Sequence, residues 1–432
     1  MRFFSSKKRP VSMGPYPVER LLRGDLPDIS GTTPIGKLSF RRPEAPENIV
    51  NAMREYQAML DAIRDGMVNK AVAEIPNDPK DRADHLKSFG YFSDASIVGI
   101  CKLPETSLLK TPIANPDIEH LAEALRTRQT KTLAAGIDVI MADLKESMEA
   151  PPTTINGHTH AVVFLYENPR EINPGEPGTE WLKDALKHRA GLRANETATV
   201  IANYIRLLGY DAKSHSMSAS DVELNQLAIA AGLIWDHKGE LVAPYIGNSF
   251  GLSAVTCSFD LKIDKALAPP KEQPWFKTKG PAWWLGKGFT KNVINRDPYA
   301  KRRFVDGAHP FERLKRVESP TTFIDEARVA RVPKRGDLFA RAQFGDMGKV
   351  NQNGTKGGYY VRKSAPSSAQ RRALGAFVLL QDGEENSKGP RPLDSKRNSE
   401  NIKAASYFLG VDAVGISRCP DWTWYSHDAT GV

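Results

Sequence analysis

Side chains that could do chemistry are concentrated in one short stretch near residue 432. Residues 419–428, Cys-Pro-Asp-Trp-Thr-Trp-Tyr-Ser-His-Asp, hold two indoles, a phenol, an imidazole and two carboxylates. A tyrosine with polar neighbours, here Tyr425, can serve as a proton donor. By composition alone, an aromatic segment that packs against another element is the favoured interpretation of this stretch.

A second group with metal-binding chemistry is a pair of histidines. His158 and His160 stand two residues apart in an expected strand, so both side chains point to the same face. Two imidazoles on one face could bind a metal ion. Because no third ligand is identifiable in the sequence, we interpret the pair as structural and predict no metal site.

A third histidine precedes a run of hydroxyl and carboxyl groups. His215 is followed by Ser216, Ser218, Ser220 and Asp221, a set that could supply a nucleophile and its base. A helix is expected to begin directly after these residues, and serine and aspartate are preferred as helix N-caps. We therefore assign Ser220 or Asp221 to the cap rather than to catalysis.

The sequence carries no motif for a disulfide framework or a dinucleotide. The three cysteines, Cys101, Cys257 and Cys419, are far apart and form no CxxC pair, which fits a reducing cytosol. The glycines of residues 247–251, Gly-Asn-Ser-Phe-Gly, are expected to form a turn, because they lack the strand–GxGxxG–helix context of a dinucleotide site.

Length and composition are those of a globular protein that needs no membrane. The 432 residues are enough for two or three domains, and 40% hydrophobic with 26% charged residues is ordinary for soluble proteins. The net charge of +9 is spread along the chain, without zinc-finger or RRM-type motifs, so we expect no nucleic-acid partner. The basic N-terminus leads into no apolar core, and no run approaches the roughly 18–20 apolar residues of a membrane span. We expect a cytoplasmic protein.

The densest pattern of secondary structure lies between Thr197 and Phe259. Its order of helix, strand, helix and strand indicates a sheet covered by helices. The expected elements are a helix at 197–208, an extended piece at 211–217, a helix at 221–233, a turn-rich passage at 244–252 and a strand at 253–259. Elsewhere we expect helices at 48–73 and 81–92, from Asn115, at 133–148 (helical or mixed) and at 367–380, and strands at 95–101 and 158–166. The continuous apolar run at 158–166 predicts a place near the sheet centre.

One pattern occurs twice in the chain. Residues 402–420 align without gaps on residues 86–104, with Lys, Tyr-Phe, Val-Gly-Ile and Pro at equivalent positions. Each copy is expected to form a helix, then a strand, then a proline exit, so we interpret the pair as an internal repeat. The second copy either adds a helix and a strand to the first domain or begins a second domain.

Parts of the central segment resemble a known family. The helix end Leu-Gly-Tyr-x-Ala at 208–212, the helix Asn-x-Leu-Ala-x-x-Ala-Gly-Leu at 225–233 and the Phe-Gly turn at 250–251 resemble the corrinoid-binding core of reductive dehalogenases. They are similar, more distantly, to epoxyqueuosine reductases. The doubled helix–strand unit resembles the cytosolic catabolic branch, which carries a duplicated nitroreductase-like module with a degenerate first copy and cobalamin in the second.

The resemblance implies an α+β fold, a nitroreductase-like and helix-flanked, mainly antiparallel sheet with the start of a second copy of the module. We expect four regions. They are an N-terminal arm and helix at 1–79, a degenerate cobalamin-binding-like module at 80–265, a wrapping connector at 266–399, and the start of a catalytic-type module, cut short, at 400–432.

The resemblance also implies a chemistry. Family members use reduced cobalamin to remove halide from an organohalide, with electrons delivered through two 4Fe–4S clusters from a donor protein or reductase domain. Tyr425 corresponds to the tyrosine that protonates the dehalogenated carbon. One 4Fe–4S cluster needs four cysteine ligands, and the chain has three scattered cysteines. We therefore expect this polypeptide alone to bind neither the clusters nor cobalamin, and to be inactive alone.

Two other hypotheses remain. The chain could be a non-catalytic module that docks on a separate cluster-bearing subunit. It could also be a flavin-dependent nitroreductase-like enzyme that binds FMN, although no obvious arginine–serine phosphate clamp is present. A homo-oligomer is compatible with each of these hypotheses.

Overall fold

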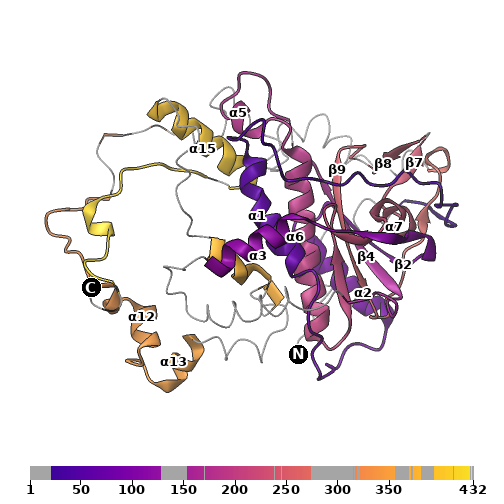
Figure 1. Ribbon diagram of the computed structural model, residues 1–432, viewed down its shortest axis with the longest axis horizontal. Coiled ribbons are helices and arrows are strands. Elements are labelled where there is room, and N and C mark those ends of the chain that lie inside the picture. Colours follow the sequence, from indigo (N-terminus) through magenta and orange to yellow (C-terminus); the bar gives the residue numbers. More distant parts are fainter. Residues whose placement is uncertain are drawn as a thin grey trace.

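The computed structural model of the chain describes most of the sequence in four blocks. These are residues 21–127, 153–273, 322–355 and 394–430, apart from positions 170, 238, 245, 412 and 429, with short pieces within 315–318 and 369–380. Figure 1 shows a body that contains the sheets and a C-terminal part that includes α12 (Leu338–Gln343) and α13 (Lys349–Thr355). The helix expected at 133–148 and much of the connector expected at 266–399 lie outside the described residues.

Four antiparallel strands form the main sheet. Their order is β2 (Ile97–Lys102), β4 (His160–Glu167), β9 (Phe250–Cys257) and β5 (Ala212–His215). Every residue of β4 except Glu167 is buried, as a strand covered on both faces must be. The predicted central position of this strand is therefore confirmed, and the strands expected at 95–101 and 253–259 are confirmed as β2 and β9.

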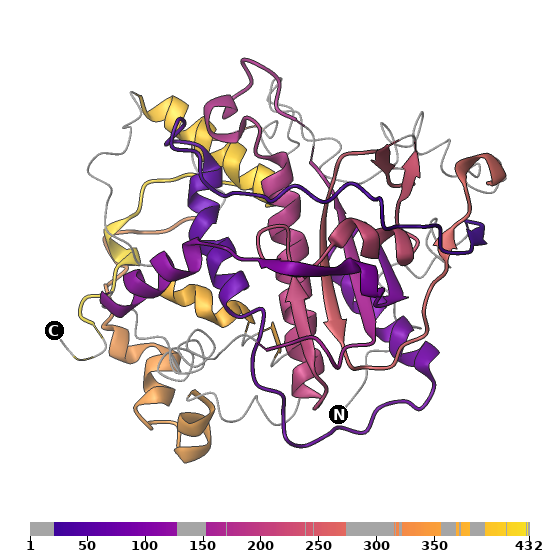
Figure 2. The same ribbon diagram turned by 45° about the vertical axis from the view of Figure 1, so that its right-hand side comes forward.

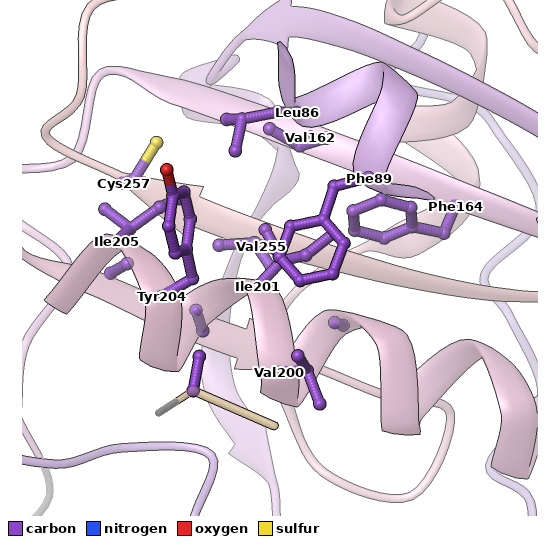
Figure 3. Packing of buried hydrophobic residues seen from close by; sticks show 14 of the residues in the cluster. Leu86, Phe89, Val162, Phe164, Val200, Ile201, Tyr204, Ile205, Val255 and Cys257 are labelled. Carbon is purple, nitrogen blue, oxygen red and sulfur yellow. The ribbon is translucent and has the colours of Figure 1, made fainter. Parts of the chain in front are cut away.

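One face of the sheet is covered by α2 (Pro79–Phe92) and the 22-residue α6 (Leu186–Leu207). In Figure 3, Phe89 of α2 lies beside Phe164 of β4 and next to Ile201 of α6. The neighbouring Tyr204 is completely buried, and its hydroxyl is 2.9 Å from His85 Nε2, which satisfies the phenol. Burial of side chains of this size contributes about 1.5–3 kcal/mol each, so this cluster is a main source of stability.

The opposite face of the sheet is covered by α7 (Leu224–Ala230), which shares a second apolar cluster with β2 and β4. The alternation of β2 directs Ile97 toward α7 and Val98 toward α2 and α6. The helix is shorter than the expected 221–233, because the short strand β6 (Ser220–Val222) precedes it. The Glu223 carboxylate accepts the Asn225 N–H and caps the helix, so the cap predicted at Ser220 or Asp221 is wrong.

The helix α1 (Ile49–Ala62) begins as predicted and ends early. The Asn48 side chain accepts the Val50 N–H at the N-cap. The prediction of a helix to residue 73 is wrong, because residues after 62 turn away and run along the end of α6. There Asn69 N–H donates to Arg206 O and Ala73 N–H to Leu208 O, each at 2.9 Å, which satisfies carbonyls that the helix end leaves open.

Short elements complete the body. The helix expected from Asn115 is α3 (Asp117–Thr127), and the Asn115 side chain accepts the Asp117 N–H. Three two-stranded sheets pair β1 (Arg23–Gly24) with β10 (Ala266–Leu267), β3 (Leu108–Ile113) with β6, and β7 (Trp235–His237) with β8 (Glu240–Val242). Further single turns are α5 (Thr179–Leu182) and 3-10 helices at Glu105–Ser107, Pro270–Glu272, Lys334–Gly336, Gly375–Leu380 and Asp421–Thr423.

The helix α15 (Ser395–Leu409) connects the C-terminal part to the body. Ala404 and Phe408 enter a third apolar cluster with Val50 of α1 and Leu182 of α5, and Figures 1 and 2 both place α15 beside these helices. The helix α15 packs closely on Gly178, because a Cβ atom added to this glycine would lie 2.5 Å from the Cβ atom of Ala404. The helix of the second repeat copy thus packs on the domain that contains the first.

The strand expected in the second repeat copy does not form. Residues 413–420 have no regular secondary structure, and within the described parts of the chain no strand pairs with them. A strand needs a hydrogen-bonded neighbour, which the first copy has in β4. The described residues also include no helix with the length and apolar character that crossing a bilayer requires.

Candidate functional site

The C-terminal aromatic stretch lies against the residues that lead into α12. Ser426 N–H donates to Val332 O at 2.9 Å, and Lys334 N–H donates to His427 O at 2.9 Å. Arg331 donates from Nε to Trp424 O at 3.1 Å and from a terminal nitrogen to Tyr425 O. Backbone pairing and one arginine therefore hold this stretch against the residues that lead into α12.

The phenol of Tyr425 is open to solvent. Its hydroxyl is 3.4 Å from Asp337 Oδ2, and the side chain is 44% exposed, next to Trp424 at 59%. The other oxygen of Asp337 caps α12 by accepting the Phe339 N–H at 2.9 Å. A proton donor acts on a substrate held within hydrogen-bond reach, and the exposure of this phenol makes it accessible from solvent.

The two histidines predicted to share a face do so, at the edge of the main sheet. They line an open cleft of about 1200 Å³ between the start of β4 and the loop after β9. His160 Nε2 is 3.7 Å from Asp260 Oδ1, and burial lowers the pKa of this imidazole. The remaining walls are of mixed character and include Lys102, Glu105, Leu108, Ile155 and Lys262. Charges of both signs leave the cleft without a focused potential.

Both histidines have hydrogen-bonding neighbours, which is compatible with a structural role. Within the described residues no three His, Cys, Asp or Glu side chains come together as a metal site would require. His158 Nδ1 is 2.7 Å from Thr256 Oγ1, and its Nε2 lies 3.2 Å from Asp211 Oδ2. Proximity of this imidazole lowers the pKa of the Asp211 carboxyl.

His215 is completely buried and shares the same hydroxyl. Its Nε2 is 2.8 Å from Thr256 Oγ1, and its Nδ1 accepts the Asp221 N–H at 3.2 Å. The second contact assigns the proton to Nε2, so His215 donates to Thr256, and the threonine hydroxyl is left to donate to His158. Burial, with the nearby charges of Arg64 and Lys213, holds the pKa of His215 well below its usual range.

The serines after His215 do not form a nucleophile–base pair with it. Ser216 Oγ donates to Asp61 Oδ1 at 2.9 Å, and Ser218 Oγ donates to Asp61 Oδ2 at 2.6 Å. The same buried carboxylate accepts three side-chain amides, those of Gln57, Asn115 and Asn195. This arrangement satisfies a buried charge, which is a structural role. The sequence analysis did not find this cluster around Asp61, because its residues are spread over some 160 positions of the chain.

Of the two glycines predicted to form a turn at 247–251, Gly247 lies in one and Gly251 does not. Gly247 has a left-handed φ of +90° and donates its N–H to Ala243 O at 2.9 Å. Gly251 belongs to β9, where a Cβ would lie 2.8 Å from the backbone of α6. The backbone conformation explains why residue 247 is a glycine, and close packing explains why residue 251 is one. Neither position requires a bound nucleotide.

The three cysteines do not fit an iron–sulfur cluster. Cys101 and Cys257 are buried on opposite faces of the main sheet, and burial raises the pKa of Cys101 and raises that of Cys257 to about 12. Cluster ligands are thiolates, which such surroundings disfavour. Cys419 is exposed, with its sulfur 3.0 Å from Thr423 Oγ1.

Comparisons with known proteins give one strong structural likeness. No protein-family model matches the chain, and no curated protein matches it. The structure is similar to that of the catabolic reductive dehalogenase NpRdhA, with 30% identity and a TM-score of 0.73 over 99% of this chain and 55% of NpRdhA. The complex of NpRdhA with 3-bromo-4-hydroxybenzoic acid gives 30% identity and 0.74, over 99% of this chain and 54% of that chain. A structure described as suggesting a mechanism for B12-dependent dehalogenation gives 31% identity and 0.73, over 99% and 55%.

The chain spans about half the length of these dehalogenases. Its fold, a mixed α/β arrangement with small antiparallel sheets, is that of the matched part of NpRdhA.

Proposed function

We propose that the chain is part of a cobalamin-dependent reductive dehalogenase, an oxidoreductase that removes halide from an organohalide. The observation that carries this proposal is the match to NpRdhA along nearly the whole chain. A neighbour in the same group was described in terms of B12-dependent dehalogenation. The sequence resemblance in residues 208–251 points to the same family from motifs alone.

In this proposal the chain has four regions. Residues 80–265 are a nitroreductase-like module that no longer binds cobalamin, preceded by the arm and helix at 1–79. A connector at 266–399 leads to the start of a catalytic-type module at 400–432. The helix α15 then joins the two modules, because its buried residues belong to the second module and pack on the first.

The cofactors of the proposed enzyme lie outside this chain. Cobalamin supplies the group that takes the halide, and two 4Fe–4S clusters supply electrons from a donor protein or reductase domain. The cysteines in this chain do not suit cluster binding, as described above. We infer that the chain alone binds none of these groups and is inactive alone.

Tyr425 is the one catalytic residue that we assign, as the proton donor to the dehalogenated carbon. Its position suits this role in part: the phenol is exposed, and its neighbours are held by backbone pairing to residues 332–334. We further propose that the protein acts in the cytoplasm, as a monomer or a homo-oligomer.

The proposal is tested by halide release. We would co-express the chain with the part of NpRdhA that lies outside the match, purify the complex without oxygen, and supply cobalamin, a strong reductant and 3-bromo-4-hydroxybenzoate. Bromide release by the complex, and none by the chain alone, is the expected result. A complex that contains cobalamin and reduced clusters yet releases no bromide, from this or from other halogenated phenols, would contradict the proposal.

A second candidate, a module that docks on a cluster-bearing subunit, is favoured by one observation. The C-terminal part presents many large apolar side chains to solvent, among them Phe323, Phe339, Val350, Ile416 and Trp424. Apolar surface on this scale is typical of a region that another polypeptide covers. This candidate differs from the first in predicting that no residue of this chain, Tyr425 included, affects turnover.

A further inference from the structure

The residues after Tyr425 pair through their backbone with the segment that leads into α12. Ser426 N–H donates to Val332 O, and Lys334 N–H donates to His427 O, each at 2.9 Å. These two bonds, one in each direction, hold the chain on one side of the tyrosine. The position of the tyrosine then depends on how the chain is held at Tyr425 itself.

A single arginine holds the chain at the tyrosine. Arg331 donates from Nε to Trp424 O at 3.1 Å and from a terminal nitrogen to Tyr425 O. Successive carbonyls of an extended chain point to opposite sides, but here the chain bends at Trp424 and again at Ser426. The bends bring both carbonyls to one guanidinium, whose rigid fork of N–H donors can bond two acceptors at once. Arg331 therefore holds the bend from which the phenol projects.

The phenol hydroxyl remains available for another partner. Its contact with Asp337 Oδ2 is 3.4 Å, whereas an ordinary O–H···O hydrogen bond is about 2.5–3.0 Å long. The other oxygen of Asp337 accepts the Phe339 N–H at 2.9 Å. Tyr425 thus combines a backbone that is held with a side chain that is 44% exposed. A proton donor needs this combination, because it must reach the reacting atom from a fixed position.

The segment that carries Arg331 leads into a unit fixed by local contacts. A single turn at Lys334–Gly336 is followed by α12, and Arg335 in this turn donates to both oxygens of Asp346, at 2.6 and 2.7 Å. A bidentate pair of arginine and carboxylate has the best-defined geometry among surface ion pairs. This unit therefore gives Arg331 a defined base.

We propose that Arg331 is a positioning residue for Tyr425. It acts through the carbonyls of Trp424 and Tyr425, and the tyrosine remains the group that gives its proton to the dehalogenated carbon. The inference rests on the proposed function, in which Tyr425 is that proton donor. Surface substitutions usually change stability little, whereas a displacement of about 1 Å can slow an enzyme by about 10²-fold. Loss of Arg331 should therefore affect turnover far more than folding.

The first experiment uses the full chain without cofactors. Arg331→Met keeps the length of the stem and removes the donors, and Arg328→Met, at an exposed position on the same segment, is the control. Amide hydrogen exchange reports the backbone bonds that Lys334 and Ser426 donate. We expect exchange at these two amides to be about tenfold faster in Arg331→Met and unchanged in Arg328→Met, at the same melting temperature.

The second experiment measures bromide release by the complex with the part of NpRdhA that lies outside the match. Arg331→Met should lower kcat by about 10–100-fold and leave KM unchanged, because the arginine acts on the proton donor and not on substrate binding. In a chain that already carries Tyr425→Phe, the same substitution should have no further effect. An arginine with a merely structural role would slow turnover equally in both backgrounds.

Three results would overturn the positioning by Arg331. One is equal exchange in Arg331→Met and the wild type, another is an undiminished kcat, and the third is further slowing in the Tyr425→Phe background. A wild-type complex that contains cobalamin and reduced clusters yet releases no bromide would contradict the proposed function instead. Exchange in the free chain would then still decide whether Arg331 holds Tyr425, because that measurement needs neither cofactor nor substrate.

Discussion

His158 and His215 lie on opposite sides of one hydroxyl, with His158 Nδ1 2.7 Å and His215 Nε2 2.8 Å from Thr256 Oγ1. The arrangement needs a neutral His215, because its Nδ1 accepts the Asp221 N–H while its Nε2 donates to the hydroxyl. Two buried histidines thus link β5, β9 and the start of β4, and protonation of His215 should loosen the sheet.

The first prediction concerns pH and stability. Burial lowers the pKa of His215 in the folded chain, whereas in the unfolded chain it is near 6.5. The unfolded state then binds more protons below this pH, so stability is present above about pH 6.5 and is lost as the pH falls. Melting temperatures measured at a series of pH values should decline from about pH 7 downward.

The matched variants assign that decline to His215. His215→Gln should be less stable at neutral pH and should show a flatter pH dependence, since the titrating group is gone. His427→Gln, at an exposed position, should retain the wild-type decline. If His215→Gln declined as steeply as the wild type, the buried imidazole would not be the source.

The second prediction concerns the carboxylate of Asp61. It accepts hydrogen bonds from five side chains, those of Gln57, Asn115, Asn195, Ser216 and Ser218. Asp61→Ala leaves these donors buried without an acceptor, which should lower the free energy of unfolding by about 3 kcal/mol or more. Urea denaturation measures this, with exposed Glu326→Ala expected to stay within about 0.5 kcal/mol of the wild type. A loss below about 1 kcal/mol for Asp61→Ala would show that water replaces the carboxylate.

The third prediction compares the two glycines of the repeat within the free chain. Gly99→Ala forces a methyl group against the Ala231 carbonyl and should cost about 1–3 kcal/mol of stability. Gly415→Ala has open space and should change stability by less than about 0.5 kcal/mol. Equal effects in denaturant titrations would mean that residues 411–418 are packed in solution.

The fourth prediction concerns Tyr425. In the complex with the unmatched part of NpRdhA, Tyr425→Phe should slow bromide release by roughly 10²–10⁴-fold, the usual effect of losing a general acid. The melting temperature of the free chain should stay unchanged, because the exposed hydroxyl makes only a 3.4 Å contact with Asp337. Unchanged turnover would remove Tyr425 from catalysis and favour the module that only docks.

Local patterns allowed the sheet and the helix starts to be predicted from the sequence. The apolar runs that became β4 and β9 are buried on both faces, and such strands have no polar alternation to obscure them. The helix starts at Asn48 and Asn115 were predicted correctly, and in the structure both side chains accept a backbone N–H two residues ahead. The end of α1 was not recognisable, since Ile63 and Met67 continue the helical spacing after the chain has turned.

Contacts between distant residues could not be predicted in the same way. The Asp61 carboxylate and the Thr256 hydroxyl gain their partners only when α1, α6 and β5 are brought together by the fold. The Val-Gly-Ile tripeptide is the same in both repeat copies, so these three residues alone do not decide whether a strand forms; the first copy has β4 as its neighbour, and no described strand pairs with the second.

The most direct test of the central claim is an absorption spectrum of the anaerobically purified chain, recorded alone and after co-expression with the unmatched part of NpRdhA. The account predicts a colourless chain, and a complex that carries the bands of cobalamin and of 4Fe–4S clusters. A brown chain with cluster absorbance, or a yellow one with bound FMN, would contradict it.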